Sequence, residues 1–383
     1  MKIPPAKIYF SEKDKSEILN RINESLTSGQ LTLGKNTREF EESFAAYLNI
    51  KNTVAVNSGT SALEIPLRIF NVKDKEVLVP TNTFFATVLA VLHAGAKVCF
   101  VEADPATFSV DVNDLKNKIG SQTAGVIVVH IGGIVTPRIN EIRELCEEHG
   151  IFLLEDAAHA HGSAYSGKKA GTFGHAASFS FYPTKLITSG EGGMIASSDE
   201  KIKNEAMLFR DQGKVSFTQN LHGKLGYNWR MSEIHAAAGL VHFRNLESFI
   251  EERANIARIY DKHLKGGNVI TPLKIPEGCR TNYYKYIAMI DKNIDRQILK
   301  NHLRDKYDVG LSGEVYETPC HLQPVFKEQF KEGDFPLAEE ICQRHICLPV
   351  YQGMKDEDAE YAAFSLKKAA EDIYGQKKIE NIK

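Results

Sequence analysis

The sequence predicts an α/β protein with a large domain built on a mostly parallel sheet, followed by a smaller α+β domain. First, short runs rich in Val, Ile and Phe recur through the first 200 residues, and continuously apolar runs are typical of strands covered on both faces. Second, helical patterns separate these runs, as in layered α/β folds. Third, the pattern changes near residue 240. A length of 383 residues suits two or three domains.

The predicted elements of the large domain alternate along the chain. The predicted strands lie at about 53–57, 76–79, 97–101, 124–130, 151–155, 177–181 and 193–196. The predicted helices lie at about 38–48, 60–70, 84–93 and 139–149. Because parallel strands need long crossover connections, which are usually helices, this alternation favours a mostly parallel sheet with helices on both faces.

We place the domain boundary between residues 1–242 and 243–383. Apolar residues at helical spacing predict one long helix from about 243 to 264, ended by a Gly-Gly pair. The remaining predicted elements are a strand at 283–290 and helices at 295–306 and 356–373, the last with Asp356 as its N-cap.

Composition excludes several classes of protein. Lys and Arg total 47 against 49 Asp and Glu, a net charge of -2, which gives no reason to expect nucleic acid or an acidic membrane surface as a partner. The N-terminus lacks the apolar run of a signal peptide or membrane span. Six cysteines without a C-x-x-C pair are typical of free thiols in a reducing compartment, so we expect a cytoplasmic protein.

The segment from Ser58 to Leu63 follows a predicted strand and opens a predicted helix. Backbone N–H groups at a helix start lack intrahelical partners and lie at the positive end of the helix dipole, so they bind anions such as phosphate. Gly59 lets a phosphate approach the backbone, and Thr60 adds a hydroxyl. Taken alone, the segment is better explained as an ordinary Ser/Thr helix cap.

Two charged residues also follow predicted strands, where ligands bind in open α/β sheets. Asp156 can pair with a cation such as a pyridinium nitrogen, although a helix-capping acid is an equal alternative. Lys185 lies among apolar, aromatic and hydroxyl residues. Most lysines are solvated surface charges, but a desolvated lysine can act as an amine nucleophile toward an aldehyde.

A fourth segment, from Leu225 to Glu233, holds the single Trp and precedes an alanine-rich helix; alone it would indicate no more than a packed loop. The chain contains no G-x-x-x-x-G-K-[ST], no G-x-G-x-x-G and no H-E-x-x-H. These absences disfavour P-loop, simple dinucleotide-binding and zinc-protease functions.

Taken together and in this order, the segments resemble the DegT/DnrJ/EryC1/StrS family of sugar aminotransferases. The resemblance covers nearly the whole chain, and the ordered set is far more specific than any one motif. Its motifs are Ser28-Gly29-Gln30-Leu31-Thr32-Leu33-Gly34, Asn57-Ser58-Gly59-Thr60-Ser61-Ala62-Leu63, Pro80-Thr81-Asn82-Thr83-Phe84-Phe85-Ala86-Thr87, Glu155-Asp156-Ala157-Ala158, Ser180-Phe181-Tyr182-Pro183-Thr184-Lys185, Gly190-Glu191-Gly192-Gly193, Asn228-Trp229-Arg230-Met231 and Pro319-Cys320-His321-Leu322-Gln323-Pro324.

The resemblance implies a fold-type I enzyme that uses pyridoxal 5'-phosphate (PLP), with pyridoxamine 5'-phosphate (PMP) as its second form. Lys185 matches the lysine that carries the cofactor. Asp156 matches the partner of the pyridinium nitrogen, and Phe84 matches the aromatic residue stacked on the ring.

The same resemblance assigns the remaining site residues. Gly59, Thr60 and Ser180 match the phosphate cradle. Asn228 matches a residue that reaches the cofactor phosphate of the neighbouring subunit, which implies a homodimer with shared active sites. His321 matches a residue near the sugar.

Three places depart from the common family pattern. His159 stands where glutamine is usual, near the phenolic oxygen of the ring, so it brings a titratable group to the catalytic set of Lys185 and Asp156. The segment 129–133 replaces a frequent His-x-Tyr-Gly-Gln, and Gln30 replaces an aromatic residue. These departures leave the identity of the sugar open.

The expected function is transfer of an amino group, with glutamate as donor, to a keto group of a nucleotide-linked deoxysugar. Related dehydratases carry histidine in place of the lysine, so Lys185 favours transamination over dehydration. Another fold-type I activity, such as a lyase, is a second alternative. A non-catalytic regulatory or binding homologue is the alternative from another class, which the intact Asp156, Ser180 and Lys185 disfavour.

Overall fold

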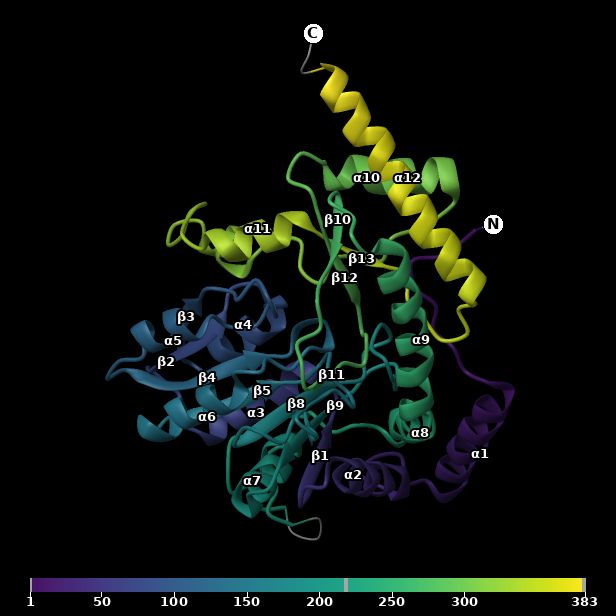
Figure 1. Ribbon diagram of the computed structural model, residues 1–383. Helices are drawn as coiled ribbons and strands as arrows, with labels where there is room; N and C mark the ends of the chain where they lie inside the picture. The colour runs from purple at the N-terminus through teal and green to yellow at the C-terminus, as the bar shows by residue number, and fades with distance from the viewer. Residues whose placement is uncertain (1, 217–219, 381–383) are drawn as a thin grey trace.

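A computed structural model describes residues 2–216 and 220–380 of the chain (Figure 1). The large domain contains a seven-stranded sheet in the order β1-β9-β8-β5-β4-β2-β3. Its strands are β1 (Asn52–Val56), β2 (Glu76–Pro80), β3 (Lys97–Val101), β4 (Thr123–Val129), β5 (Phe152–Asp156), β8 (Ala176–Ser180) and β9 (Gly193–Ser197). β9 runs antiparallel to both of its neighbours and the other pairs are parallel, which confirms the mostly parallel sheet.

Helices cover both faces of this sheet, because its strands are apolar on both sides. In β4, Val126 and Val128 pack into one core and Ile127 and Val129 into the other, and all four are buried. The first face carries α2 (Lys35–Leu48), α5 (Val112–Lys118), α6 (Ile139–Glu148) and α8 (Glu233–Phe243). The second face carries α3 (Gly59–Ile69), α4 (Phe85–His93) and α7 (Glu200–Arg210).

The predicted long helix of the second domain begins later than expected. Phe243 ends α8, and α9 begins at Leu246 after a two-residue break, so the expected start near 243 was wrong. The first half of α9 packs on the large-domain core through residues such as Phe249, and the second half, from Ile256, packs on a separate core. α9 therefore connects the two cores, and the boundary at 242/243 stays a prediction.

The separate core belongs to a three-stranded antiparallel sheet in the order β10-β12-β13, with helices packed on it (Figure 1). Its elements are α9 (Leu246–Leu264), β10 (Ile270–Pro272), β12 (Tyr286–Ile290), α10 (Arg296–Tyr307), β13 (His345–Leu348) and α12 (Asp356–Glu380). α11 (Pro336–Arg344) and a small sheet of β6 (Ala164–Tyr165), β7 (Lys168–Lys169) and β11 (Cys279–Arg280) complete the chain. Asp356 is the first residue of α12 and not its N-cap, and this helix continues past the predicted end at 373.

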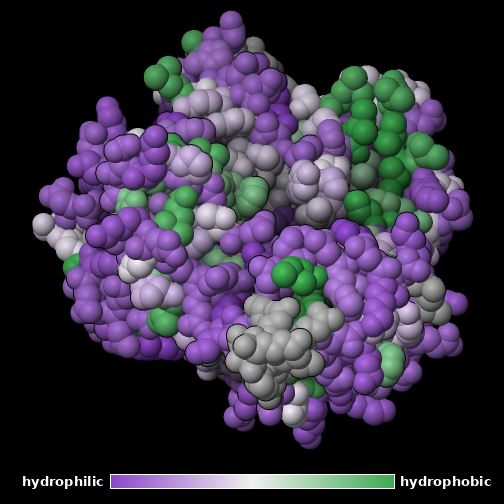
Figure 2. Space-filling model, turned by 90° about the horizontal axis from the view of Figure 1, so that it is seen from above, coloured by the Kyte–Doolittle hydropathy of each residue, from purple (hydrophilic) through white to green (hydrophobic). Residues whose placement is uncertain are grey.

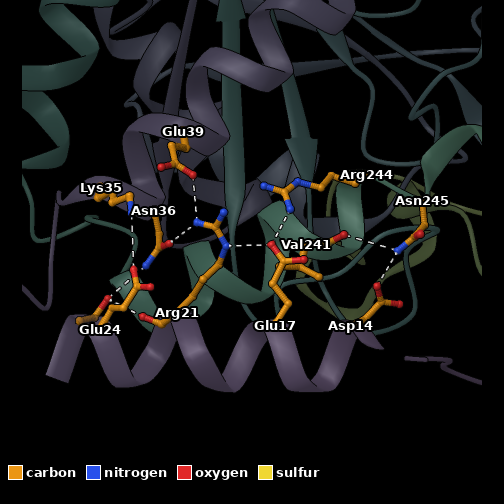
Figure 3. A network of polar contacts seen from close by, with 11 residues as sticks. Asp14, Glu17, Arg21, Glu24, Lys35, Asn36, Glu39, Val241, Arg244 and Asn245 are labelled. Atoms are coloured by element: carbon orange, nitrogen blue, oxygen red, sulfur yellow. Dashed lines mark hydrogen bonds and ion pairs between the residues drawn. The ribbon is translucent and has the colours of Figure 1, made fainter. Parts of the chain in front are cut away.

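The N-terminal helix α1 (Glu12–Ser28) was absent from our prediction, although a capping box formed by Ser11 and Asp14 starts it. Figure 3 shows its polar side chains pointing toward α2 and toward the α8–α9 break. Arg21 donates hydrogen bonds to Asn36 and Glu39, each at 2.9 Å. These polar contacts attach α1 to the large domain, and Ser25 is its buried residue, so no run of buried apolar side chains marks this helix in the sequence.

Glu233 links two segments that are far apart in the sequence. Its buried carboxylate accepts hydrogen bonds from the backbone N–H groups of Gly34, Asn36 and Thr37, at 2.8, 2.7 and 3.0 Å. A carboxylate at a helix N-terminus satisfies unpaired donors and complements the helix dipole, so Glu233 caps α2 from the start of α8.

Figure 2 shows a mostly hydrophilic face with hydrophobic side chains in separate patches. Within residues 2–216 and 220–380, no helix has the length and apolar character needed to cross a bilayer.

Candidate active site

A cavity of about 440 Å³ opens at the edge of the sheet where β1, β2, β4, β5 and β8 end. Segments that follow these strands form most of its wall, and residues 284, 315 and 316 close it from the second domain. The parallel topology explains this gathering, because the carboxyl ends of parallel strands meet at one edge. Seven predicted site residues line the cavity: Gly59, Thr60, Phe84, Asp156, His159, Ser180 and Lys185.

The N-terminus of α3 forms one end of the cavity. Ser58 is the N-cap, and its side chain accepts the N–H of Ser61, while the N–H groups of Gly59 and Thr60 find no acceptor in the described part of the chain. A Cβ at Gly59 would lie 2.7 Å from the Cβ of Ser180, so only glycine allows this helix start to pack against the end of β8. Two free N–H groups beside the hydroxyls of Thr60 and Ser180 form an anion site.

Asp156 lies at the end of β5 and is 5% exposed. Its oxygens accept hydrogen bonds from the Thr87 hydroxyl at 2.8 Å and the Ala158 N–H at 3.1 Å. Burial raises the pKa of this carboxyl, and these hydrogen bonds and the charge of Lys185 oppose the shift. The donors hold the carboxylate toward the cavity, and a cation placed there would favour its ionised form.

Glu155 has a different role because neighbouring strand residues point to opposite faces. Its fully buried carboxylate accepts the N–H groups of Gly171, Phe173 and Gly174 at 2.6–2.7 Å and contacts His130 Nε2 at 2.8 Å. Glu155 therefore orders the 171–174 loop, and only Asp156 of the two adjacent acids faces the cavity.

Lys185 projects into the cavity from the loop after β8. Its Nζ lies 5.1 Å from the ring centroid of Tyr284. The Tyr284 ring also stacks on His159, with centroids 4.2 Å apart and an interplanar angle of 23°. Burial, together with the charges of Lys185 and Lys285, holds the pKa of His159 well below its usual value, so this imidazole is neutral at physiological pH.

Asn228 lies outside this cavity on an exposed loop. The loop is well anchored: Asn228 pairs with Asp211 in a β-bridge, Arg230 forms an ion pair with Asp211, and the Tyr227 and Trp229 rings stack at 4.0 Å. An exposed side chain on a fixed loop is compatible with reaching a second subunit, which stays a prediction.

His321 also lies outside this cavity. Its ring is fully buried and does not line the cavity. Nδ1 lies 2.7 Å from the Thr81 hydroxyl and Nε2 lies 3.1 Å from Glu339. Through these two contacts His321 connects the loop after β2 to α11, and its proximity to the sugar stays a prediction.

Gly132 and Gly133, in the divergent 129–133 segment, also have a packing role. Both have positive φ angles, 66° and 91°. An added Cβ would lie 2.7 Å from Ile287 Cδ1 at the first position and 2.1 Å from Asn282 Oδ1 at the second. These glycines allow the second domain to approach the sheet edge closely.

Three cavity residues were not singled out from the sequence. Thr87 donates to Asp156, and its position one helical turn after Phe84 was the available signal. Tyr284 and Tyr316 come from the second domain and carry no motif that marks them, because only the folded chain brings them to the sheet edge.

Comparison with known proteins agrees with this geometry. Residues 12–367 match the DegT/DnrJ/EryC1/StrS aminotransferase family. The chain belongs to this family. It is 32% identical to a GDP-perosamine synthase of Vibrio cholerae over 343 residues, 88% of this chain and 91% of the relative. PseC of Helicobacter pylori, an aminotransferase involved in the biosynthesis of pseudoaminic acid, superposes with a TM-score of 0.90 at 26% identity, over 97% of this chain and 100% of PseC.

The family is one of PLP-dependent sugar-nucleotide aminotransferases. Spr1654 of Streptococcus pneumoniae, solved in a PMP form, superposes with a TM-score of 0.90 at 26% identity over 99% of this chain and 100% of Spr1654. The present residues fit this cofactor. Within the residues that the structure describes, Asp156 is a buried acid without a hydrogen-bonded cation, and the start of α3 offers free N–H groups to a phosphate.

The buried histidines of this family member predict acid sensitivity. Burial lowers the pKa of His161 to about 3 and that of His345 to about 4, and it holds the pKa of His159 well below its usual value. Between these values and 6.5 the unfolded chain binds more protons than the folded chain, so stability falls as pH drops below about 6.5. At pH 5 we expect a loss of about 2 kcal/mol for each of His161 and His345.

Urea unfolding at pH 5 and pH 7.5 measures this loss. His161→Leu should lose about 2 kcal/mol less than the parent chain between the two pH values, since leucine does not titrate. A variant as acid-sensitive as the parent would show that His161 does not contribute.

Proposed function

We propose that this chain is a homodimeric PLP enzyme that transfers an amino group from glutamate to a keto group of a nucleotide-linked deoxysugar. The observation that carries the proposal is the meeting of Lys185 and Asp156 in one cavity whose far end is the free N-terminus of α3. Transamination needs a cofactor-bearing amine, an acid opposite the ring nitrogen and a phosphate site, and these residues supply all three.

In this proposal the chain's own residues hold and orient the reacting groups. Lys185 would bind the cofactor, Asp156 would face its ring nitrogen, and Gly59, Thr60 and Ser180 would bind its phosphate. When bound, PLP supplies an electron sink that stabilises negative charge on the carbon that loses or gains a proton. The free Nζ of Lys185 accepts that proton and returns it as general acid and base.

His159 and Phe84 complete the cofactor contacts in the proposal. His159 Nδ1 is buried and has no partner within the described residues, so it is available to a phenolic oxygen. Phe84 is 63% exposed at the mouth of the cavity, although it is a large apolar ring. Stacking on a planar cofactor would cover this surface.

The dimer and the location in the cell belong to the same proposal. Asn228 is exposed and rigidly placed, as a residue that completes a partner's phosphate site must be. Light scattering that gave the mass of one chain would contradict the dimer. The six free cysteines support a cytoplasmic location, which fractionation of expressing cells checks.

A panel assay tests the function. The PLP-loaded protein is incubated with glutamate and a set of 3-keto and 4-keto nucleotide sugars, and 2-oxoglutarate and sugar products are measured. We expect release of 2-oxoglutarate in equal amount to one aminated sugar. Loss of water from the sugar without 2-oxoglutarate would indicate a dehydratase, and a protein without cofactor absorbance would indicate a binding or regulatory homologue.

A further inference from the structure

The Lys185 amine has an unusual partner. Within the described residues it makes no hydrogen bond or ion pair, and its close neighbour is the ring of Tyr284, with Nζ 5.1 Å from the centroid. Lys285 Nζ lies 5.6 Å from the same centroid, but it also donates to the Gly313 carbonyl at 2.9 Å. The π face is therefore the main contact of the Lys185 amine and only a secondary one for Lys285.

An aromatic face attracts an ammonium group within about 6 Å, because the ring carries negative charge above its plane. Such a face holds the cation without accepting its proton. A carboxylate in the same place would form a charge-assisted hydrogen bond and compete for that proton. A lysine that must exchange protons during a reaction does so more readily beside an aromatic face than beside a carboxylate, because the aromatic face binds its ammonium form more weakly.

The surroundings hold Tyr284 in one place. Asn282 is fully buried: its Nδ2 donates to the carbonyls of His159 and His161 at 2.9 and 3.0 Å, and its Oδ1 accepts the Tyr284 N–H at 2.9 Å. Buried Arg253, on α9, donates to the carbonyls of Tyr283 and Tyr284 at 3.0 and 3.4 Å. The Asn282 bonds join the second domain to the segment after β5, and the Arg253 bonds fix residues 283 and 284 against α9.

The backbone and the hydroxyl support the same placement. Tyr283 adopts a left-handed conformation with φ 48°, which is strained for a bulky residue and marks a turn that the structure must maintain. The Tyr284 hydroxyl lies 3.5 Å from that of Thr184, one residue before Lys185. Burial alone would raise the pKa of Tyr284, but Lys185 and Lys285 bring it below its usual value, in agreement with cations near the ring.

We propose that Tyr284 is a positioning residue whose ring face holds the Lys185 amine beside the cofactor site whenever that amine is not bonded to the cofactor. The inference rests on the proposed function, because only a lysine that binds and releases a cofactor needs such a resting place. It adds a residue from the second domain to the cofactor machinery, which otherwise comes from the first.

Chemical labelling of the PMP form, in which Lys185 is free, tests the contact. Acetic anhydride is added, and the acetylation rate of Lys185 is read by peptide mass spectrometry in the parent chain and in Tyr284→Phe and Tyr284→Leu. We expect about a three- to tenfold faster reaction in the leucine variant, the range that loss of a cation–π contact gives. The phenylalanine variant keeps the face and should stay within about twofold of the parent.

Lys169 serves as internal control, since its Nζ lies 4.4 Å over the Tyr47 ring, away from the cavity, and its rate should be the same in all three chains. An unchanged Lys185 rate in the leucine variant, or an equal rise in the phenylalanine variant, would overturn the proposal.

If the leucine variant does not fold, NMR of the parent chain tests the contact. A ¹³C-dimethylated Lys185 should show an upfield ring-current shift, and a resonance at the position of free dimethyl-lysine would overturn the contact.

These readouts do not depend on turnover. Failure of the sugar panel with the expected labelling pattern would reject the proposed substrate and leave the Tyr284 contact standing. Amino transfer to a sugar, together with an unchanged Lys185 labelling rate in Tyr284→Leu, would support the proposed function and reject the Tyr284 contact.

Discussion

Replacing Lys185 with alanine should abolish amino transfer while the protein still binds PLP. The variant loses the amine that carries the cofactor and the group that moves the proton, so we expect turnover to fall by about 10⁴-fold or more. Binding should persist, because Asp156, Phe84 and the N-terminus of α3 are unchanged. Release of 2-oxoglutarate measures the first effect, and cofactor absorbance after gel filtration measures the second.

Lys169→Ala is the matched control, because it also removes a lysine above a tyrosine ring but lies outside the cavity. Its turnover should equal that of the parent chain. Undiminished turnover of Lys185→Ala would contradict the assigned role of Lys185, and with it the proposed mechanism.

Asp156→Asn should produce the second large effect. We expect it to weaken cofactor binding or turnover and to stabilise the cofactor-free protein. The amide keeps the shape, since its oxygen can accept the Ala158 N–H while its NH2 group donates to the Thr87 hydroxyl, but it removes the charge that faces the ring nitrogen. Loss of one partner of a buried charged pair costs about 3–5 kcal/mol, so turnover or PLP affinity should fall by about 10²- to 10⁴-fold.

The same substitution should increase the stability of the cofactor-free protein at neutral and alkaline pH. Burial raises the pKa of Asp156, so the folded chain holds a proton that the unfolded chain releases at lower pH. For an acid shifted in this direction, stability is lost as pH rises through the two pKa values, and the uncharged amide removes that loss. Without cofactor, Asp156→Asn should therefore resist urea better than the parent at pH 8.

Asp199→Asn provides the comparison for both measurements. Asp199 caps α7, and asparagine caps helices equally well, so PLP affinity and stability should stay near the parent values. If Asp156→Asn bound PLP as tightly as this control, Asp156 would not be the partner of a cationic ring.

Much of the large domain was readable from the sequence, because its strands are short, apolar and separated by helices. The run at 124–130 is β4 within one residue, and 151–155 is β5 within one residue. Strands buried on both faces leave this signal in composition alone. α1 was missed although a capping box marks its start, and the α8–α9 break was read as part of one helix because the buried Phe243, Leu246 and Phe249 continue the helical spacing across it.

Some residues of the candidate site could likewise be placed from the sequence, and others could not. Gly59, Asp156 and Lys185 each follow a strand that the sequence predicts, so parallel topology was enough to bring them to one edge. His321 lies in a motif of the same family, yet its ring is turned away from the cavity and bonded to Thr81 and Glu339. A motif specifies which residue is present, whereas the packing around it decides where the side chain points.

The sequence by itself determined the α/β fold of the large domain, the family, and the lysine, acid and helix start of the cofactor site. Local periodicity and strand order suffice for these, because each residue is placed by the element that immediately precedes it. Only the tertiary structure decided that Tyr284 and Tyr316 close the cavity. Contacts between segments more than a hundred residues apart depend on how two cores dock, and no local pattern records that docking.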